Sequence, residues 1–217
     1  NDGRQSFGIR GTFSMILEGK NGRDSLDRIQ ERSEKQYAAV SGYLEFVSAN
    51  HQKIKELVNN ARQYLTNTQF DYVFTQMEHV AGEAPLEMSL LDTGENSLKK
   101  ITVYNYHPIV KPLDSVKAPL GYLVPLNDSR FKALLRKHYL QSEPADLKKF
   151  GKLQQYRIGK VSKIEREGEM IQFPELQTEE IDAGQVQGEY LFVPLKQLSS
   201  KWLMLALEPQ SMIGLVQ

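Results

Sequence analysis

Glu18 is the residue of this chain whose surroundings in the sequence most suggest catalysis. It follows a short apolar run at residues 11–17 that is rich in Phe, Ile and Leu, and a glycine-containing loop comes directly after it. A run of this kind predicts a buried strand. A buried strand that ends on a carboxylate can present a general acid or base at the edge of a sheet. The alternative interpretation is a salt-bridged glutamate at the end of a strand.

The remaining residues with potential for metal binding or catalysis do not form known motifs. The four histidines have no second ligand at a spacing that would place two ligands on one face, so the sequence predicts no metal site. His51 and His138 fall on apolar helical faces, which favours packed, hydrogen-bonded side chains. Arg10 could bind a carboxylate, but an exposed charge before the strand is the simpler interpretation. Carboxylate clusters at residues 165–167 and 179–182 are expected in solvated loops.

The composition restricts the classes of function. Lys and Arg number 27, as do Asp and Glu, and the net charge of zero argues against a nucleic-acid partner. No apolar run approaches the roughly 20 residues that a membrane-spanning helix needs, so no transmembrane segment is expected. Cysteine is absent, which excludes disulfides, thiolate zinc ligands and cysteine nucleophiles.

A long amphipathic helix is predicted behind the glutamate strand. Asp24 or Ser25 would cap it, and apolar side chains recur every three or four residues from Leu26 to Leu65. Gly42 is a weak point or a kink. The helix is expected to lie on a sheet; the alternative is a seam for a second chain, which would give a dimer through this helix.

The second part of the chain is expected to be rich in short strands. Residues 67–69 form a linker, a hairpin joins 86–91 to 101–104, and residues 111–119 form a proline-containing loop. The other predicted elements are strands at about 70–74, 120–125, 156–164, 170–173 and 190–195, and two short helices after 127–129 and at 199–207. We therefore predict an α+β chain, with part of an α/β layer at residues 1–66 and a mixed, β-rich domain at 67–217.

Three stretches of the sequence are distinctive when they are taken in order. Residues 7–18 read Phe-Gly-Ile-Arg-Gly-Thr-Phe-Ser-Met-Ile-Leu-Glu, and residues 121–138 contain Gly-Tyr-x-x-Pro followed by Leu-Leu-Arg-x-His. Residues 190–211 contain Val-Pro-x-x-Gln and Leu-Glu-Pro-x-Ser. This ordered set resembles the zinc metallocarboxypeptidases of the carboxypeptidase A type, in particular bacterial members with an additional C-terminal domain.

The resemblance implies that Glu18 is the general base that activates a zinc-bound water for hydrolysis of a peptide substrate. It also implies that residues 1–66 end the catalytic α/β domain and that residues 67–217 form the appended domain. In that family the zinc ligands, a substrate-binding arginine and a catalytic tyrosine precede the glutamate strand, and only 17 residues precede Glu18 here. Zinc is therefore expected in an intact parent protein and not in this chain, which is expected to be inactive alone. A periplasmic or secreted location is implied in the same way.

Two other functions remain open from the sequence. The nine Phe and ten Tyr residues could form a surface for a peptide, a glycan or a protein, which would make the chain a non-catalytic binding module of an envelope or secreted protein. The long helix could instead make the chain an oligomerisation protein.

Overall fold

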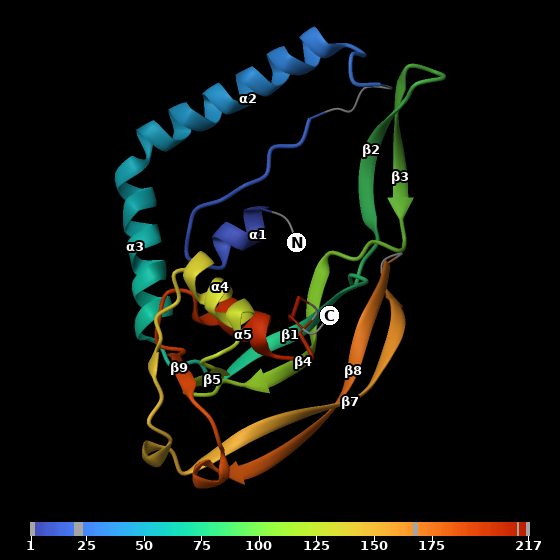
Figure 1. The fold of residues 1–217 in the computed structure, drawn as a ribbon. Helices are drawn as coiled ribbons and strands as arrows, with labels where there is room; N and C mark the ends of the chain where they lie inside the picture. Colours follow the sequence, from blue (N-terminus) through green and yellow to red (C-terminus); the bar gives the residue numbers. More distant parts are fainter. Residues whose placement is uncertain (1–2, 20–23, 167–168, 212, 216–217) are drawn as a thin grey trace. The chain divides into compact units, whose positions relative to one another are not determined.

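The chain folds into two compact units, each assembled from three separate segments. The computed structural model describes residues 3–19, 24–166, 169–211 and 213–215. Its helices and antiparallel sheets confirm the predicted α+β class (Figure 1). The first unit comprises residues 1–69, 119–149 and 186–203, and the second comprises residues 70–118, 150–185 and 204–217.

The first unit holds the longest helices. Its helical elements are α1 (Gly3–Gly8), α2 (Ile29–Ala49), α3 (His51–Asn67), α4 (Ser129–Lys137) and η1 (Leu147–Lys149), and α5 (Ser200–Leu207) spans the division between the units. Across the described ranges, no helix has both the length and the apolar character that a membrane crossing requires.

The predicted long helix is two helices, α2 and α3, which meet at an angle (Figure 1). The break falls at Asn50, whose backbone has φ −113° and ψ 14°, and not at Gly42. The Asn50 side chain donates a hydrogen bond to the carbonyl of Phe46 at 2.9 Å. Such a side chain offers the backbone an alternative to helical hydrogen bonding, whereas a single glycine costs only about 1 kcal/mol.

A small antiparallel sheet joins distant parts of the first unit. It consists of β5 (Gly121–Pro125), β9 (Tyr190–Pro194) and β6 (Glu143–Pro144), in that order. Gly121 lies opposite Pro194, and a Cβ atom at Gly121 would lie 2.5 Å from the carbonyl oxygen of Val193, so this pairing requires glycine. The buried apolar residues of this unit are Leu65, Val124, Leu135, Leu140, Val193, Leu195 and Leu203.

The predicted glutamate strand at residues 11–18 is wrong. Residues 12–19 have no regular secondary structure, and Phe13, Met15, Ile16 and Leu17 are between 43% and 50% exposed. A strand needs a neighbour to satisfy its backbone N–H and C=O groups. Among the described residues, every strand pair is formed by residues from Tyr72 onward. The apolar run therefore has no strand to pair with and remains extended and partly exposed.

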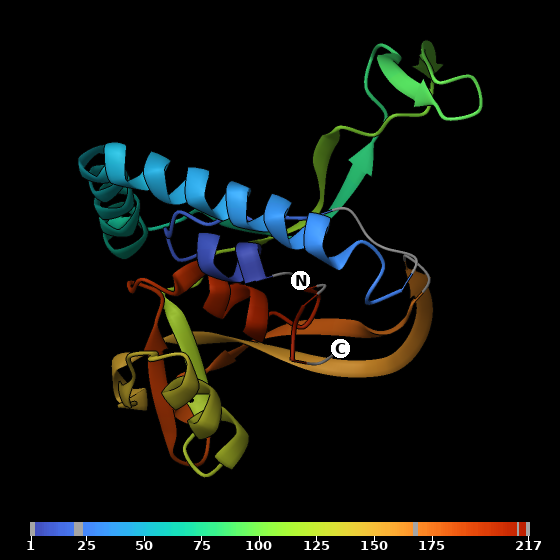
Figure 2. The ribbon, with the colours of Figure 1, turned by 90° about the horizontal axis from the view of Figure 1, so that it is seen from above.

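In the part of the second unit that the structure describes, the strands form three antiparallel pairs. They are β1 (Tyr72–Val80) with β4 (Ile109–Lys117), β2 (Leu86–Asp92) with β3 (Ser97–Val103), and β7 (Lys152–Arg166) with β8 (Glu169–Asp182); η2 (Ala183–Gln185) follows β8. The predicted hairpin, now β2–β3, is confirmed. The strands β7 and β8 form a long, curved ribbon (Figure 2).

Two predicted loops of the second unit are strands. The proline-containing stretch forms most of β4, and Pro112 lies opposite Met77 next to an irregularity in the register, where a missing N–H donor is tolerated. The carboxylates at residues 179–182 belong to β8 and not to a loop. Strand β7 supplies the partners of the two glutamates, because Arg157 donates to Glu179 at 2.7 Å and Lys152 forms an ion pair with Glu180.

The helix α4 ends in a six-residue hydrogen-bonded cap. Asp128 accepts from the N–H of Arg130 at the start, as predicted. At the other end, the N–H of Tyr139 donates to the carbonyl of Arg136, and the N–H of Leu140 donates to the carbonyl of Leu135. This pairing is a Schellman motif, which places one residue in the left-handed region. That residue is Tyr139, with φ 53°, and its side chain is 93% exposed.

Replacing Tyr139 by glycine is expected to stabilise the protein by about 1 kcal/mol, because glycine adopts the left-handed conformation without the cost that other residues bear. The exposed ring contributes little packing that would be lost. Thermal or urea unfolding measures the change. Tyr139→Ala is the matched control: it removes the ring but keeps the strain, so its stability should stay near that of the original chain. Equal stabilisation by both variants would contradict the explanation.

Candidate functional site

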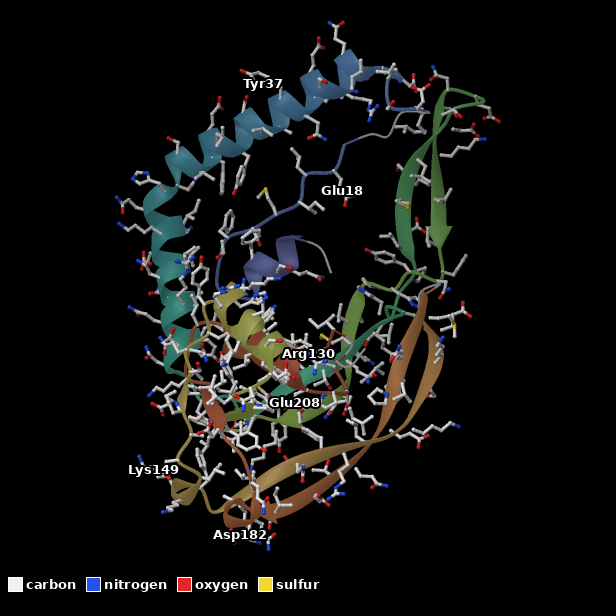
Figure 3. All side chains as sticks on the ribbon, viewed as in Figure 1. Glu18, Tyr37, Arg130, Lys149, Asp182 and Glu208 are labelled. Carbon is white, nitrogen blue, oxygen red and sulfur yellow. The ribbon has the colours of Figure 1, made fainter. Side chains whose placement is uncertain are left out.

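Glu18, the predicted catalytic residue, lies exposed on the extended segment between α1 and α2 (Figure 3). The residues that the structure describes include no group of three or more His, Cys, Asp or Glu side chains that could hold a metal ion. Two polar side chains from distant parts of the first unit, His138 and Ser199, instead contact Arg10, eight positions before Glu18 in the sequence.

The backbone around Arg10 is fixed against α3. A turn after α1 is closed by hydrogen bonds from Arg10 N–H to the carbonyl of Phe7 and from Gly11 N–H to that of Gly8. Gly11 has φ 65°, and a Cβ atom there would lie 3.3 Å from the backbone of Ala61. Glycine is thus required at this position both for its conformation and for the close approach to α3. The turn directs the Arg10 side chain to the elements that follow β5 and β9 in the sequence.

Arg10 contacts two polar side chains and one aromatic ring. Its Nη2 lies 2.8 Å from Nδ1 of His138, and its Nε donates to Oγ of Ser199 at 3.3 Å. The guanidinium carbon lies 5.4 Å from the centre of the Trp202 ring, a distance at which cation–π attraction operates. His138 stacks on Trp202 with ring centres 3.8 Å apart. Trp202 on α5 therefore supports both the arginine and the histidine.

These contacts define the protonation state of His138. An arginine can only donate hydrogen bonds, so Nδ1 of His138 must accept, and the ring hydrogen lies on Nε2. Burial lowers the pKa of His138, and the positive charges of Arg10 and Lys137 lower it further. His138 is therefore a neutral, positioned side chain at pH 7. It lines the same pocket as its two positive neighbours.

An open pocket of about 280 Å³ lies beside Arg10. Its lining residues come from three segments of the first unit: Arg10, Lys137, His138, Tyr139, Gln141, Gln197, Leu198 and Ser199. The buried Gln197 fixes one wall, because its Oε1 accepts from the N–H of Gln141 at 3.0 Å and its Nε2 donates to the carbonyl of Pro194.

The second unit has a polar cluster of its own around Glu208. The Tyr156 hydroxyl on β7 donates to the Glu208 carboxylate at 2.7 Å, and Glu208 is only 1% exposed. Two positions after Glu208, the carbonyl of Gln210 accepts a hydrogen bond from the Gln76 side chain, and the next residue, Ser211, is fully buried. The Leu-Glu-Pro-x-Ser stretch at residues 207–211 therefore contributes buried polar side chains and hydrogen bonds to the second unit.

One residue of the Arg10 cluster has the environment that the sequence predicted. His138 is packed and hydrogen-bonded as predicted, whereas His51 is exposed at the start of α3, where its Nδ1–H donates to the Ser48 carbonyl. The interpretation of Arg10 as an exposed charge is wrong, because its contacts with His138 and Ser199 partly bury it. Neither Trp202 nor Ser199 was predicted from the sequence to belong to a site. Trp202 is the single tryptophan of the chain, and that was a signal for its role.

Comparison with known proteins gives no assignment: no family model, no curated protein and no solved structure matches this chain. The resemblance to zinc metallocarboxypeptidases consequently rests on the three ordered stretches of sequence alone.

Proposed function

We propose that this chain is the C-terminal part of a zinc metallocarboxypeptidase-like peptidase that hydrolyses peptide bonds, with Glu18 as its general base. The observation that supports the proposal is that the first two stretches and residues 190–203 of the third lie in the first unit, whereas residues 204–211 belong to the second. The strand β5 of the second stretch pairs with β9 of the third. Arg10 of the first stretch contacts His138 of the second across 128 positions of sequence.

The role proposed for Glu18 requires an accessible carboxylate, and its side chain is exposed. A general base must come within about 3 Å of the proton that it takes, directly or through one water. Zinc in such a peptidase would supply the activation of the attacking water, and its ligands would come from residues outside this chain. The substrate would be a peptide, and hydrolysis by the chain alone is not expected.

The polypeptide that contains this chain should release C-terminal amino acids from peptides. The measurement is quantification of free amino acids after incubation with a set of short peptides, before and after chelation and with Zn²⁺ returned. Loss on chelation and recovery with zinc are expected. Its coding sequence should contain His-x-x-Glu and a later, separate His before Asn1. A coding sequence without these ligands, or a purified polypeptide with no hydrolysis in zinc-containing buffer, would overturn the proposal.

Non-catalytic binding by the β-rich part is a second candidate, which the hairpin β2–β3 favours. Among the described residues, β2 and β3 pair with each other and with no third strand. Several of their apolar side chains are exposed, including Leu91 at 57% and Leu98 at 75%. Exposed apolar groups of this kind suit a protein partner.

A dimer through α2 and α3 remains a separate prediction, for which exposed side chains such as Leu44 offer a surface.

A further inference from the structure

The pocket beside Arg10 has an electrostatic character that the proposed hydrolysis does not use. Two of its described lining residues, Arg10 and Lys137, are positively charged, and none is Asp or Glu. His138 adds no charge at pH 7, but its Nε2–H is a donor. Gln141, Gln197 and Ser199 also line the pocket, although most of its surface is apolar and the Gln197 amide is bonded to the backbone of Gln141 and Pro194. A concave surface with one sign of charge raises the local concentration of the opposite ion.

Arg10 retains hydrogen-bonding capacity for a ligand. A guanidinium has five N–H groups in a fixed, planar arrangement. The contacts with Ser199 and His138 use Nε and one hydrogen of Nη2, which leaves three N–H groups not engaged by these two bonds. The Trp202 ring and the two hydrogen bonds hold the guanidinium in one orientation. An ordered arginine loses less conformational entropy when it binds a ligand, and its geometry matches an oxyanion.

The C-terminal end of α4 adjoins the pocket, and its carbonyl groups repel an anion only weakly. Unsatisfied carbonyl groups at a helix C-terminus carry a partial negative charge. At this end the carbonyl groups of Leu134, Leu135 and Arg136 all accept hydrogen bonds from the cap residues 138–140. The two basic residues of the last turn, Arg136 and Lys137, add positive charge at the same end. The net field at the pocket is therefore set by the basic side chains.

We propose that this pocket binds a small oxyanion, a carboxylate or phosphate group held by Arg10, with Lys137 at the rim. The volume of about 280 Å³ lies just below the usual range for small-molecule sites, so the ligand carries few further atoms. Leu198 and the exposed ring of Tyr139 offer apolar contact to a short carbon group attached to the anion. The site uses residues of the first unit and does not depend on catalysis by Glu18.

Titration of the full chain with inorganic phosphate and, separately, with benzoate tests the site. Isothermal calorimetry or NMR chemical shifts of the His138 ring and the Trp202 indole report binding. Saturable binding of at least one probe is expected; phosphate alone or benzoate alone identifies the preferred class of oxyanion. Arg10→Gln should weaken it about tenfold or more, since a charge-assisted hydrogen bond is lost. Lys137→Gln should weaken it only a few-fold, because this charge is exposed.

Lys132→Gln is the matched control, since Lys132 is an exposed lysine of α4 that does not line the pocket. Its affinity should equal that of the original chain. Circular dichroism checks the fold of each variant. If Arg10→Gln does not fold, the affinities of Arg10→Lys and Lys137→Gln for the probes test the site in its place. Absence of saturable binding for both probes overturns the proposal. The same holds for binding that the folded variants of Arg10 and Lys137 leave unchanged.

Discussion

Replacing Glu18 by glutamine should reduce kcat of the polypeptide that contains this chain by about 10²–10⁴-fold, the usual contribution of a general base. Glutamine has nearly the shape of glutamate but cannot take a proton from water. Because the Glu18 side chain is exposed, folding stability should change by no more than about 0.5 kcal/mol. The measurement is steady-state hydrolysis of a peptide substrate, with unfolding followed in parallel.

Glu45→Gln provides the matched control for this experiment. Glu45 is also exposed and lies on α2 in the same unit, so its replacement removes one negative charge without touching the proposed base. Its kcat and KM should match those of the original protein. A Glu18→Gln protein that keeps its kcat would exclude Glu18 as the base, whether or not hydrolysis depends on zinc.

The elements that the sequence predicted well depend on local signals. The helix α4 has a capping aspartate at its start and an apolar stripe, and the hairpin β2–β3 has alternating residues around a turn at 93–96. Capping and turn chemistry act over three or four residues, so a single stretch contains all the information. The same holds for β5 and β9, which are short apolar runs bounded by proline.

The errors concern pairing between distant residues. The run at 11–18 has the composition of a strand but no described neighbour, whereas the polar stretch at 174–182 is a strand because β7 lies beside it. Composition alone cannot distinguish these cases, since the preference of a residue for strands depends on its cross-strand contacts. The break between α2 and α3 was missed for another reason: the Asn50 side chain bonds to the backbone, and hydrophobic spacing does not reveal that.

The Arg10 cluster could not be derived from motif spacing. Arg10 and His138 lie 128 positions apart, and Ser199 lies 189 positions from Arg10. Each of these residue types is common at a protein surface, so none attracts notice alone. Only the pairing of β5 with β9 and the turn at Gly11 bring them together. The residues of the cluster do fall within the three distinctive stretches: Arg10 lies in 7–18, His138 in 121–138 and Ser199 in 190–211.

Tyr156→Phe is expected to lower the free energy of unfolding by about 2 kcal/mol, because hydrogen bonds to charged groups contribute roughly 1.5–3 kcal/mol. The hydroxyl of Tyr156 donates to the nearly inaccessible carboxylate of Glu208, so its removal takes a donor from a carboxylate that water barely reaches. Urea unfolding measures the change. Tyr37→Phe is the control: Tyr37 is 76% exposed on α2, and its hydroxyl should contribute little.

Glu208→Gln extends this prediction to a double-mutant cycle. Combined with Tyr156→Phe, it should show a coupling energy of about 1 kcal/mol or more, since the two side chains contact each other directly. Additive effects of the two substitutions would mean that the hydroxyl and the carboxylate stabilise the protein independently.

The pH dependence of the Tyr156→Phe effect follows from the titration of the hydroxyl. Burial raises the pKa of Tyr156 well above its ordinary value near 10, and the hydrogen bond to Glu208 and its negative charge raise it further. The unfolded chain therefore loses this proton first, so the stabilisation is complete below about pH 10 and declines as the pH rises through the folded-state pKa. The stability difference between the original chain and Tyr156→Phe should be constant from pH 7 to 9 and smaller at pH 11. An equal difference at pH 8 and pH 11 would show that the hydroxyl is not protected by Glu208.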